Sequence, residues 1–253
     1  MRIGLRLVVL AAVLAAVGCG GGTRYPDKPV TVGPIGTDSD AVWVFRPAGK
    51  PKDLVVFFHG QGGPDETRPI NHLPWIRHLV SKGSVVVYPR FETFYEQNPI
   101  PFIVTGVRAA AKQVDIDGLP VLAIGYSRGG ALAVEYGAVA GKNKLPAPGE
   151  IMSVFPASVG NEGNIVDLKT IDHSTQIVIQ MGQADAVVGR TGARHLLLRL
   201  KQGGFPARNI RLDFVSSQPG FVADHAAPLR TSAAAQAAFW GAADELLDEL
   251  NQK

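Results

Sequence analysis

Residues 119–141 contain the pattern that most restricts the fold of this chain. An apolar stretch runs into G-Y-S-R-G at residues 125–129, and an alanine-rich apolar stretch follows. These stretches predict a strand over residues 121–125 and a helix over residues 128–141. Small glycines on both sides of the serine permit a sharp, strained turn that holds its hydroxyl out at the carboxyl edge of a sheet. We therefore predict that Ser127 is a nucleophile.

Strand-like and helix-like patterns alternate along the rest of the chain. Residues 54–58 are apolar on both faces, as in a buried central strand, whereas residues 209–215 alternate apolar and polar, as in an edge strand with one wet face. This alternation predicts an α/β fold with a mostly parallel central sheet and helices on both faces. The other predicted strands cover residues 42–45, 84–88, 151–155 and 176–180. The other predicted helices cover residues 70–82, 105–114, 193–202 and 229–250.

A glycine-rich segment follows directly after the buried strand and reads H-G-Q-G-G over residues 59–63. Glycines let the backbone turn its N–H groups toward one point, as the oxyanion of a tetrahedral intermediate requires. The segment resembles the histidine-glycine oxyanion loop of esterases and lipases. We predict that the amide of Arg128, next to the serine, is one donor. The amide of Gln61 is the second, with Gly62 as the alternative, and we interpret His59 as a structural partner within the loop.

Together these motifs resemble the α/β-hydrolase superfamily over residues 40–250. The resemblance implies the α/β-hydrolase fold, and we assign it to one domain at residues 41–253. In that superfamily the catalytic acid and the histidine follow the serine along the chain, in that order. A serine hydroxyl needs these partners because it is a poor nucleophile at neutral pH.

Three histidines follow Ser127, and His225 is the predicted general base. His173 precedes a predicted strand, so it belongs to the sheet edge away from the serine. His195 lies within a predicted helix. Only His225 falls in a loop beyond the last predicted strand, where the imidazole can reach the serine.

Asp185 is the predicted acid. It is the only acidic residue in the segment 181–189, which directly follows a predicted strand. The other candidates lie within a strand, beside the histidine or ahead of a strand: Asp213, Asp224, Asp167 and Asp172. A side chain adjacent to His225 in an extended loop points away from it. The predicted triad is therefore Ser127, Asp185 and His225.

Residues 1–18 have the pattern of a signal peptide. Arg2 and Arg6 precede an apolar run of 11 residues, 7–17. A permanent membrane span needs about 20 apolar residues, so this run is too short to be one. The pattern predicts export.

Cys19 is the only cysteine of the chain, so no internal disulfide can form. It follows small residues, and the segment resembles a bacterial lipobox, in which the cysteine is lipidated and becomes the new amino terminus. Ala16 departs from that pattern, which has a bulky apolar residue there. We assign residues 19–40 to the lipidated terminus and a flexible tether. The expected location is the cell membrane or envelope, anchored through Cys19; ordinary cleavage and secretion is the alternative.

The charge of the chain argues against a nucleic-acid partner. The net charge is +3, and without the predicted signal 23 basic residues stand against 22 acidic ones. No basic run or basic patch interleaved with aromatic residues remains. The sequence contains no cofactor motif and no metal-ligand cluster, so we expect neither. The predicted reaction is hydrolysis of a small-molecule or lipid carboxylic ester through an acyl-enzyme on Ser127. An acyltransferase or peptidase with the same triad, and a non-catalytic membrane-tethered binding module, are the alternatives.

Two features near the predicted site each have two interpretations. Phe91, Phe94, Tyr95 and Phe102 follow a predicted strand, and they either line an acyl pocket or pack a surface loop. The side chain of Arg128 either contacts an anionic group or is solvated.

Overall fold

The computed structural model describes residues 25–63, 67–92, 98–158 and 166–253. The predicted signal peptide and Cys19 lie outside these residues. Eight strands are present in the described part: β1 Val30–Ile35, β2 Val42–Arg46, β3 Asp53–Phe58, β4 Ser84–Pro89, β5 Val121–Tyr126, β6 Glu150–Val154, β7 Gln176–Gly182 and β8 Ile210–Val215.

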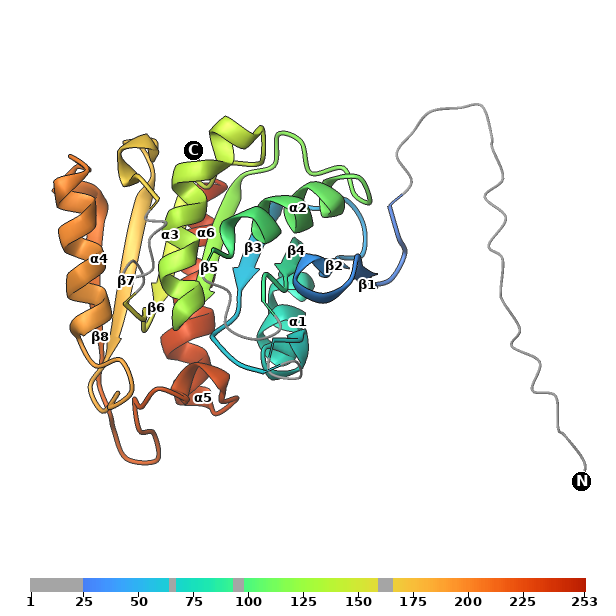
Figure 1. Ribbon diagram of the computed structural model, residues 1–253. Helices are drawn as coiled ribbons and strands as arrows, with labels where there is room; N and C mark the ends of the chain where they lie inside the picture. Colours follow the sequence, from blue (N-terminus) through green and yellow to red (C-terminus); the bar gives the residue numbers. More distant parts are fainter. Residues whose placement is uncertain (1–24, 64–66, 93–97, 159–165) are drawn as a thin grey trace, which may run out of the picture.

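The strands form one sheet in the order β1-β2-β4-β3-β5-β6-β7-β8 (Figure 1). Neighbours from β4 to β8 run parallel, whereas β1 and β2 are antiparallel at one edge. The central strands β3 and β5 are buried along their whole length. The predicted mostly parallel sheet is therefore confirmed.

Helices cover both faces of the sheet (Figure 1). Their bounds are α1 Leu73–Lys82, α2 Ile100–Ala111, α3 Arg128–Ala140, α4 Thr191–Gln202, α5 Ala233–Ala235 and α6 Ala242–Leu250, with a π-helical stretch at Gln236–Gly241. Helices α2, α3 and α4 pack on one face, and α1, α6 and the π-helical stretch pack on the other. No helix among the described residues is long and apolar enough to cross a membrane.

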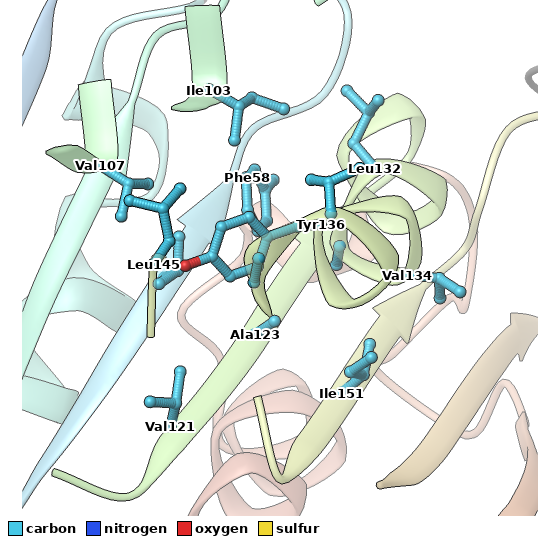
Figure 2. Close-up of a cluster of buried hydrophobic side chains, with 14 of the residues drawn as sticks. Phe58, Ile103, Val107, Val121, Ala123, Leu132, Val134, Tyr136, Leu145 and Ile151 are labelled. Atoms are coloured by element: carbon cyan, nitrogen blue, oxygen red, sulfur yellow. The ribbon is translucent and has the colours of Figure 1, made fainter. Parts of the chain in front are cut away.

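Each face of the sheet has its own apolar core. Figure 2 shows part of one core, where Tyr136 of α3 lies among Phe58 of β3, Ile103 and Val107 of α2, and Leu132. The hydroxyl of Tyr136 donates to the carbonyl of Pro146 at 2.7 Å, so this buried polar atom is satisfied. Side chains of β5 pack in both cores and those of α3 in one, and Ser127 lies in the turn between these two elements.

Several element boundaries differ from the sequence predictions, and one strand was not predicted. The sheet begins at Val30, inside the segment 19–40 that we interpreted as a tether. Side chains of β1 are mostly exposed, and Gly33 and Pro34 interrupt the strand, so its sequence carries no hydrophobic period. Helix α2 begins at Ile100 rather than residue 105, since Pro101 is accommodated in its first turn. The terminal helix begins at Ala233 rather than residue 229.

Strand β8 is an edge strand, as predicted, but two of its apolar side chains are exposed, while Ile210 and Val215 at its ends are partly buried. Leu212 is 47% and Phe214 43% exposed. The guanidinium of Arg190 lies 4.7 Å from the ring centroid of Phe214. Alternation of apolar and polar residues therefore identified the strand but gave the wrong environment for its apolar face.

Candidate active site

Ser127 occupies the turn between β5 and α3 in a backbone conformation that is rare for a residue with a side chain. Its φ is 56° and its ψ is −120°. The amide of Ser127 donates to the carbonyl of Val154 at 2.9 Å, and its carbonyl accepts from the amide of Ala157 at 3.0 Å. The strained turn is thus fixed by the end of the neighbouring strand β6.

The two flanking glycines are required by close backbone contacts. A Cβ on Gly125 would overlap the carbonyl oxygen of Gly129, and a Cβ on Gly129 would overlap the carbonyl oxygens of Phe58 and His59. The first contact joins β5 to α3, and the second joins α3 to the loop after β3. The glycines therefore bring the serine turn against the predicted oxyanion loop.

We expect Gly125→Ala to destabilise the protein by about 3 kcal/mol, the upper end of the range for overpacking, because the opposing atoms are backbone and cannot turn away. Gly141→Ala is the control, since Gly141 has helical dihedrals and nothing within 4 Å of a new Cβ. That change is expected to be neutral or to stabilise by about 0.4–1 kcal/mol. Urea unfolding of both variants measures the difference, and equal midpoints would contradict this account.

The structure brings Ser127, His225 and Asp185 into one hydrogen-bonded chain. Nε2 of His225 lies 3.0 Å from Oγ of Ser127, and Nδ1 of His225 lies 2.9 Å from Oδ2 of Asp185. An ionised carboxylate only accepts hydrogen bonds, so Nδ1 carries the proton and Nε2 is left to accept the serine proton. The side chain of Asp185 is fully buried and that of His225 is 16% exposed.

Asp185 is fixed by the turn that follows β7. Its Oδ1 accepts from the amides of Val187 at 2.9 Å and Val188 at 3.1 Å, which leaves Oδ2 for the histidine. The amide of Ala184 also donates to the carbonyl of Ala223 at 3.0 Å. This last bond ties the acid loop to the histidine loop, so the Asp185–His225 distance is set by backbone contacts.

A further contact to the histidine loop was not predicted from the sequence. The hydroxyl of Tyr126 donates to the backbone carbonyl of His225 at 2.8 Å, and the two rings lie 5.1 Å apart. Burial raises the pKa of this phenol, so it stays a donor. Tyr126 is the last residue of β5, and no sequence pattern relates it to a residue 99 positions away.

The other acid and histidine candidates lie elsewhere. Asp224 pairs with Arg230 at 2.7 Å, and this hydrogen bond lowers the pKa of Asp224. Asp213 pairs with Arg211 on the exposed edge strand, and Asp167 caps a short helical turn. Asp172 bonds the backbone of Ser174 ahead of β7, the ring of His173 packs on Phe205, and His195 lies in α4.

The sequence matches no protein-family model and no curated protein. Its structure resembles a truncated carbohydrate esterase from gut microbiota, with 13% identity over 91% of this chain and 100% of the other and a TM-score of 0.60. The structure also resembles Thermogutta terrifontis esterase 2 phosphorylated by paraoxon, with 17% identity over 89% of this chain and 95% of the other and a TM-score of 0.60. It resembles esterase B from Lactobacillus rhamnosis, inhibited by a tributyrin phosphonate, with 14% identity over 90% of this chain and 88% of the other and a TM-score of 0.62.

The chain has the α/β-hydrolase fold. The comparisons cover nearly the whole of the described sheet and its helices, and at these identities they establish the architecture. In this α/β-hydrolase fold, Ser127, Asp185 and His225 all lie in turns that follow parallel strands or in the loop beyond the last of them.

The predicted oxyanion loop lies beside the serine. A Cβ on Gly60 would stand 3.4 Å from Cβ of Ser127, so the loop approaches the nucleophile closely. Gln61 lies in this loop and is exposed. Arg128 is the first residue of α3, where the backbone N–H groups have no partner within the helix and point out from its end. These positions are compatible with amide donors on two sides of the serine.

His59 is buried within that loop, which supports its interpretation as a structural residue. Its ring stacks on Phe91 with centroids 3.9 Å apart, and its nitrogens lie against the carbonyl oxygens of Gly60 and Arg90. Burial lowers the pKa of His59 to about 4, so the ring is neutral at pH 7 and donates one of these bonds. The ring ties the oxyanion loop to the segment after β4.

The side chain of Arg128 is not solvated, and the anionic group that it contacts is the carboxylate of Glu92. It is only 4% exposed and forms an ion pair with Glu92, which is fully buried. Glu92 follows Phe91 in the segment after β4, and Nε of Arg90 in that segment donates to the hydroxyl of Thr67 at 3.0 Å. A buried ion pair therefore connects the start of α3 with the segment after β4, and the ring of His59 connects that segment with the oxyanion loop.

Two of the four aromatic residues after β4, Phe91 and Phe102, lie within the described part of the chain, and both pack against other side chains. Phe91 is fully buried against His59, which fits the packing interpretation. Phe102 packs against the core from α2. Phe94 and Tyr95 lie outside the described residues. Within residues 25–63, 67–92, 98–158 and 166–253, no group of three or more His, Cys, Asp or Glu side chains is placed to hold a metal ion.

Proposed function

We propose that this protein is a serine hydrolase that cleaves carboxylic esters. The observation that carries the proposal is the continuous hydrogen-bonded chain from Asp185 through His225 to Ser127, at a strained turn that presents the hydroxyl. Several structures with the same fold are described as esterases, and this favours ester bonds as the substrate class. A small-molecule or lipid ester is the proposed substrate, without a nucleic-acid partner.

The geometry supports a two-step acyl transfer. His225 takes the hydroxyl proton as the oxygen of Ser127 attacks the ester carbonyl carbon, while Asp185 holds the imidazole and stabilises its charge. The amides of Arg128 and Gln61 would donate to the oxyanion of the tetrahedral intermediate. The C–O bond to the alcohol then breaks, and His225 returns the proton to the leaving alcohol. Water, activated by the same histidine, hydrolyses the acyl-enzyme and releases the carboxylic acid.

A fluorophosphonate probe tests the proposed nucleophile. We expect the wild-type protein to be labelled at Ser127, as an activated serine attacks phosphorus, and the Ser127→Ala variant to remain unlabelled. Acyl esters of increasing chain length, compared with the matching amides, then separate esterase from peptidase activity. A folded wild-type protein that neither reacts with the probe nor hydrolyses any ester would sink the proposal in favour of a binding module.

The proposal includes export and a lipid anchor at Cys19, on the support of the amino-terminal sequence pattern alone. Mass spectrometry of the mature protein is expected to find an acylated Cys19 as the first residue. An unmodified cysteine, or cleavage at another position, would leave a secreted hydrolase instead.

A further inference from the structure

A large apolar groove lies at the β1 edge of the sheet, away from the serine. Its volume is about 690 Å³. Its walls are β1, β2, one face of α1 and the loop before α1, and its lining is Pro29, Val30, Thr31, Trp43, Phe45, Arg68, Pro69, Ile70, Leu73, Arg77, Val80 and Ser81. Strands β4 and β3 separate β2 from β5, so the groove belongs to none of the triad residues.

Two large apolar side chains at this groove are directed to solvent. Ile70 is 68% and Val30 is 40% exposed, although the groove behind them is lined mainly by apolar residues. Single exposed apolar side chains are ordinary on a protein surface, but two at the mouth of an apolar groove indicate a surface that is covered in use.

The chain enters the folded domain at this groove. Residues Pro29, Val30 and Thr31 line it, and the part of the chain outside the described residues ends only five positions before Pro29, at residue 24. Cys19 is ten positions before Pro29, and an extended segment of that length reaches at most about 35 Å. A lipid on Cys19 would therefore hold this side of the protein close to the bilayer.

The charge of the groove selects the kind of bilayer. Arg77 lines it and is exposed, and none of the lining residues that the structure describes is acidic. Basic side chains around inserted apolar ones are the arrangement that binds anionic lipid headgroups.

We propose that the groove formed by β1, β2 and α1 docks on a bilayer that contains anionic phospholipids. Ile70 and Val30 enter the headgroup region, and Arg77 pairs with a lipid phosphate. The contact fixes how the catalytic domain faces the membrane. It rests on the proposed lipid anchor at Cys19 and goes beyond the proposed ester hydrolysis, which does not require it.

A fluorescent label at residue 70 tests this orientation. The full lipidated chain is prepared as Ile70→Cys, labelled with an environment-sensitive fluorophore and reconstituted in phosphatidylcholine vesicles with and without phosphatidylglycerol. Leu198→Cys is the matched control, because Leu198 is 51% exposed on α4 near the opposite edge of the sheet. We expect brominated lipids to quench the label at residue 70 at least about twofold more than the label at residue 198, and only in the anionic vesicles. Arg77→Glu should abolish that excess, whereas Arg194→Glu on α4 should preserve it.

Three results would overturn the proposal. One is equal quenching at the two positions in anionic vesicles. Another is a blue-shifted label at residue 70 before vesicles are added, which would mean that the groove is filled by the chain's own amino-terminal segment or a second copy. The third is labelling of the wild-type chain at Cys19, because a free thiol there would remove the anchor. Ester turnover in detergent, measured in parallel, reports the proposed function separately and is expected to be the same for all these variants.

Discussion

Ester turnover is expected to fall by about 10⁶-fold in Ser127→Ala and His225→Ala and by about 10⁴-fold in Asp185→Asn, as in other enzymes that use such a triad. Ser127→Ala removes the attacking oxygen, and His225→Ala removes the group that takes its proton. Asp185→Asn keeps the shape of the acid but offers an N–H where the histidine needs an acceptor. The ring then favours the tautomer that cannot accept the serine proton.

Asp224→Asn is the matched control for the acid. It removes a carboxylate next to His225, but this carboxylate pairs with Arg230 rather than with the imidazole. We expect turnover within a few-fold of wild type. Initial rates with a short-chain ester, corrected for folded protein by circular dichroism, provide the comparison. Undiminished turnover in Asp185→Asn would mean that another carboxylate supplies the acid, and Asp167 and Asp213 would be tested next.

Much of this site follows from where its residues stand relative to predicted strands. Asp185 and His225 are the predicted acid and base because they follow strands at the carboxyl edge of the sheet. In the structure His225 contacts both Asp185 and Ser127. Buried strands such as β3 and β5 have strong apolar patterns, so their positions in the chain are reliable signals. The glycines around the serine are equally informative, because each meets backbone atoms that exclude a side chain.

Contacts between distant loops carry no comparable signal. Glu92 and Arg128 are 36 positions apart. The segment around Glu92 mixes aromatic and charged residues, a composition that is also found in exposed loops. Their pairing depends on how the segment after β4 packs against α3, which only the assembled sheet determines. Strand β1 was missed for a related reason, since backbone pairing with β2 forms it rather than burial of its side chains.

The buried Glu92–Arg128 pair is expected to affect both stability and catalysis. Glu92→Gln removes the negative charge beside a guanidinium that is 4% exposed, and the loss of one partner of a buried pair typically costs about 3–5 kcal/mol. Because the backbone amide of Arg128 is a proposed oxyanion donor, a displaced Arg128 should also lower kcat. A lost oxyanion donor costs about 10²–10³ in kcat, and a displaced one should cost less, about 10-fold or more, with KM little changed.

Glu135→Gln separates the two effects. Glu135 of α3 pairs with Arg199 of α4 at 2.7 Å, and both side chains are less than one-tenth exposed. The Glu135–Arg199 pair resembles the Glu92–Arg128 pair in burial and chemistry. Its arginine is on α4, however, whereas Arg128 is the residue next to Ser127. We expect both variants to unfold at lower urea concentration, and only Glu92→Gln to lose kcat per folded molecule. Equal kcat in the two variants, measured below both unfolding transitions, would show that Glu92 stabilises the fold without positioning the oxyanion donor.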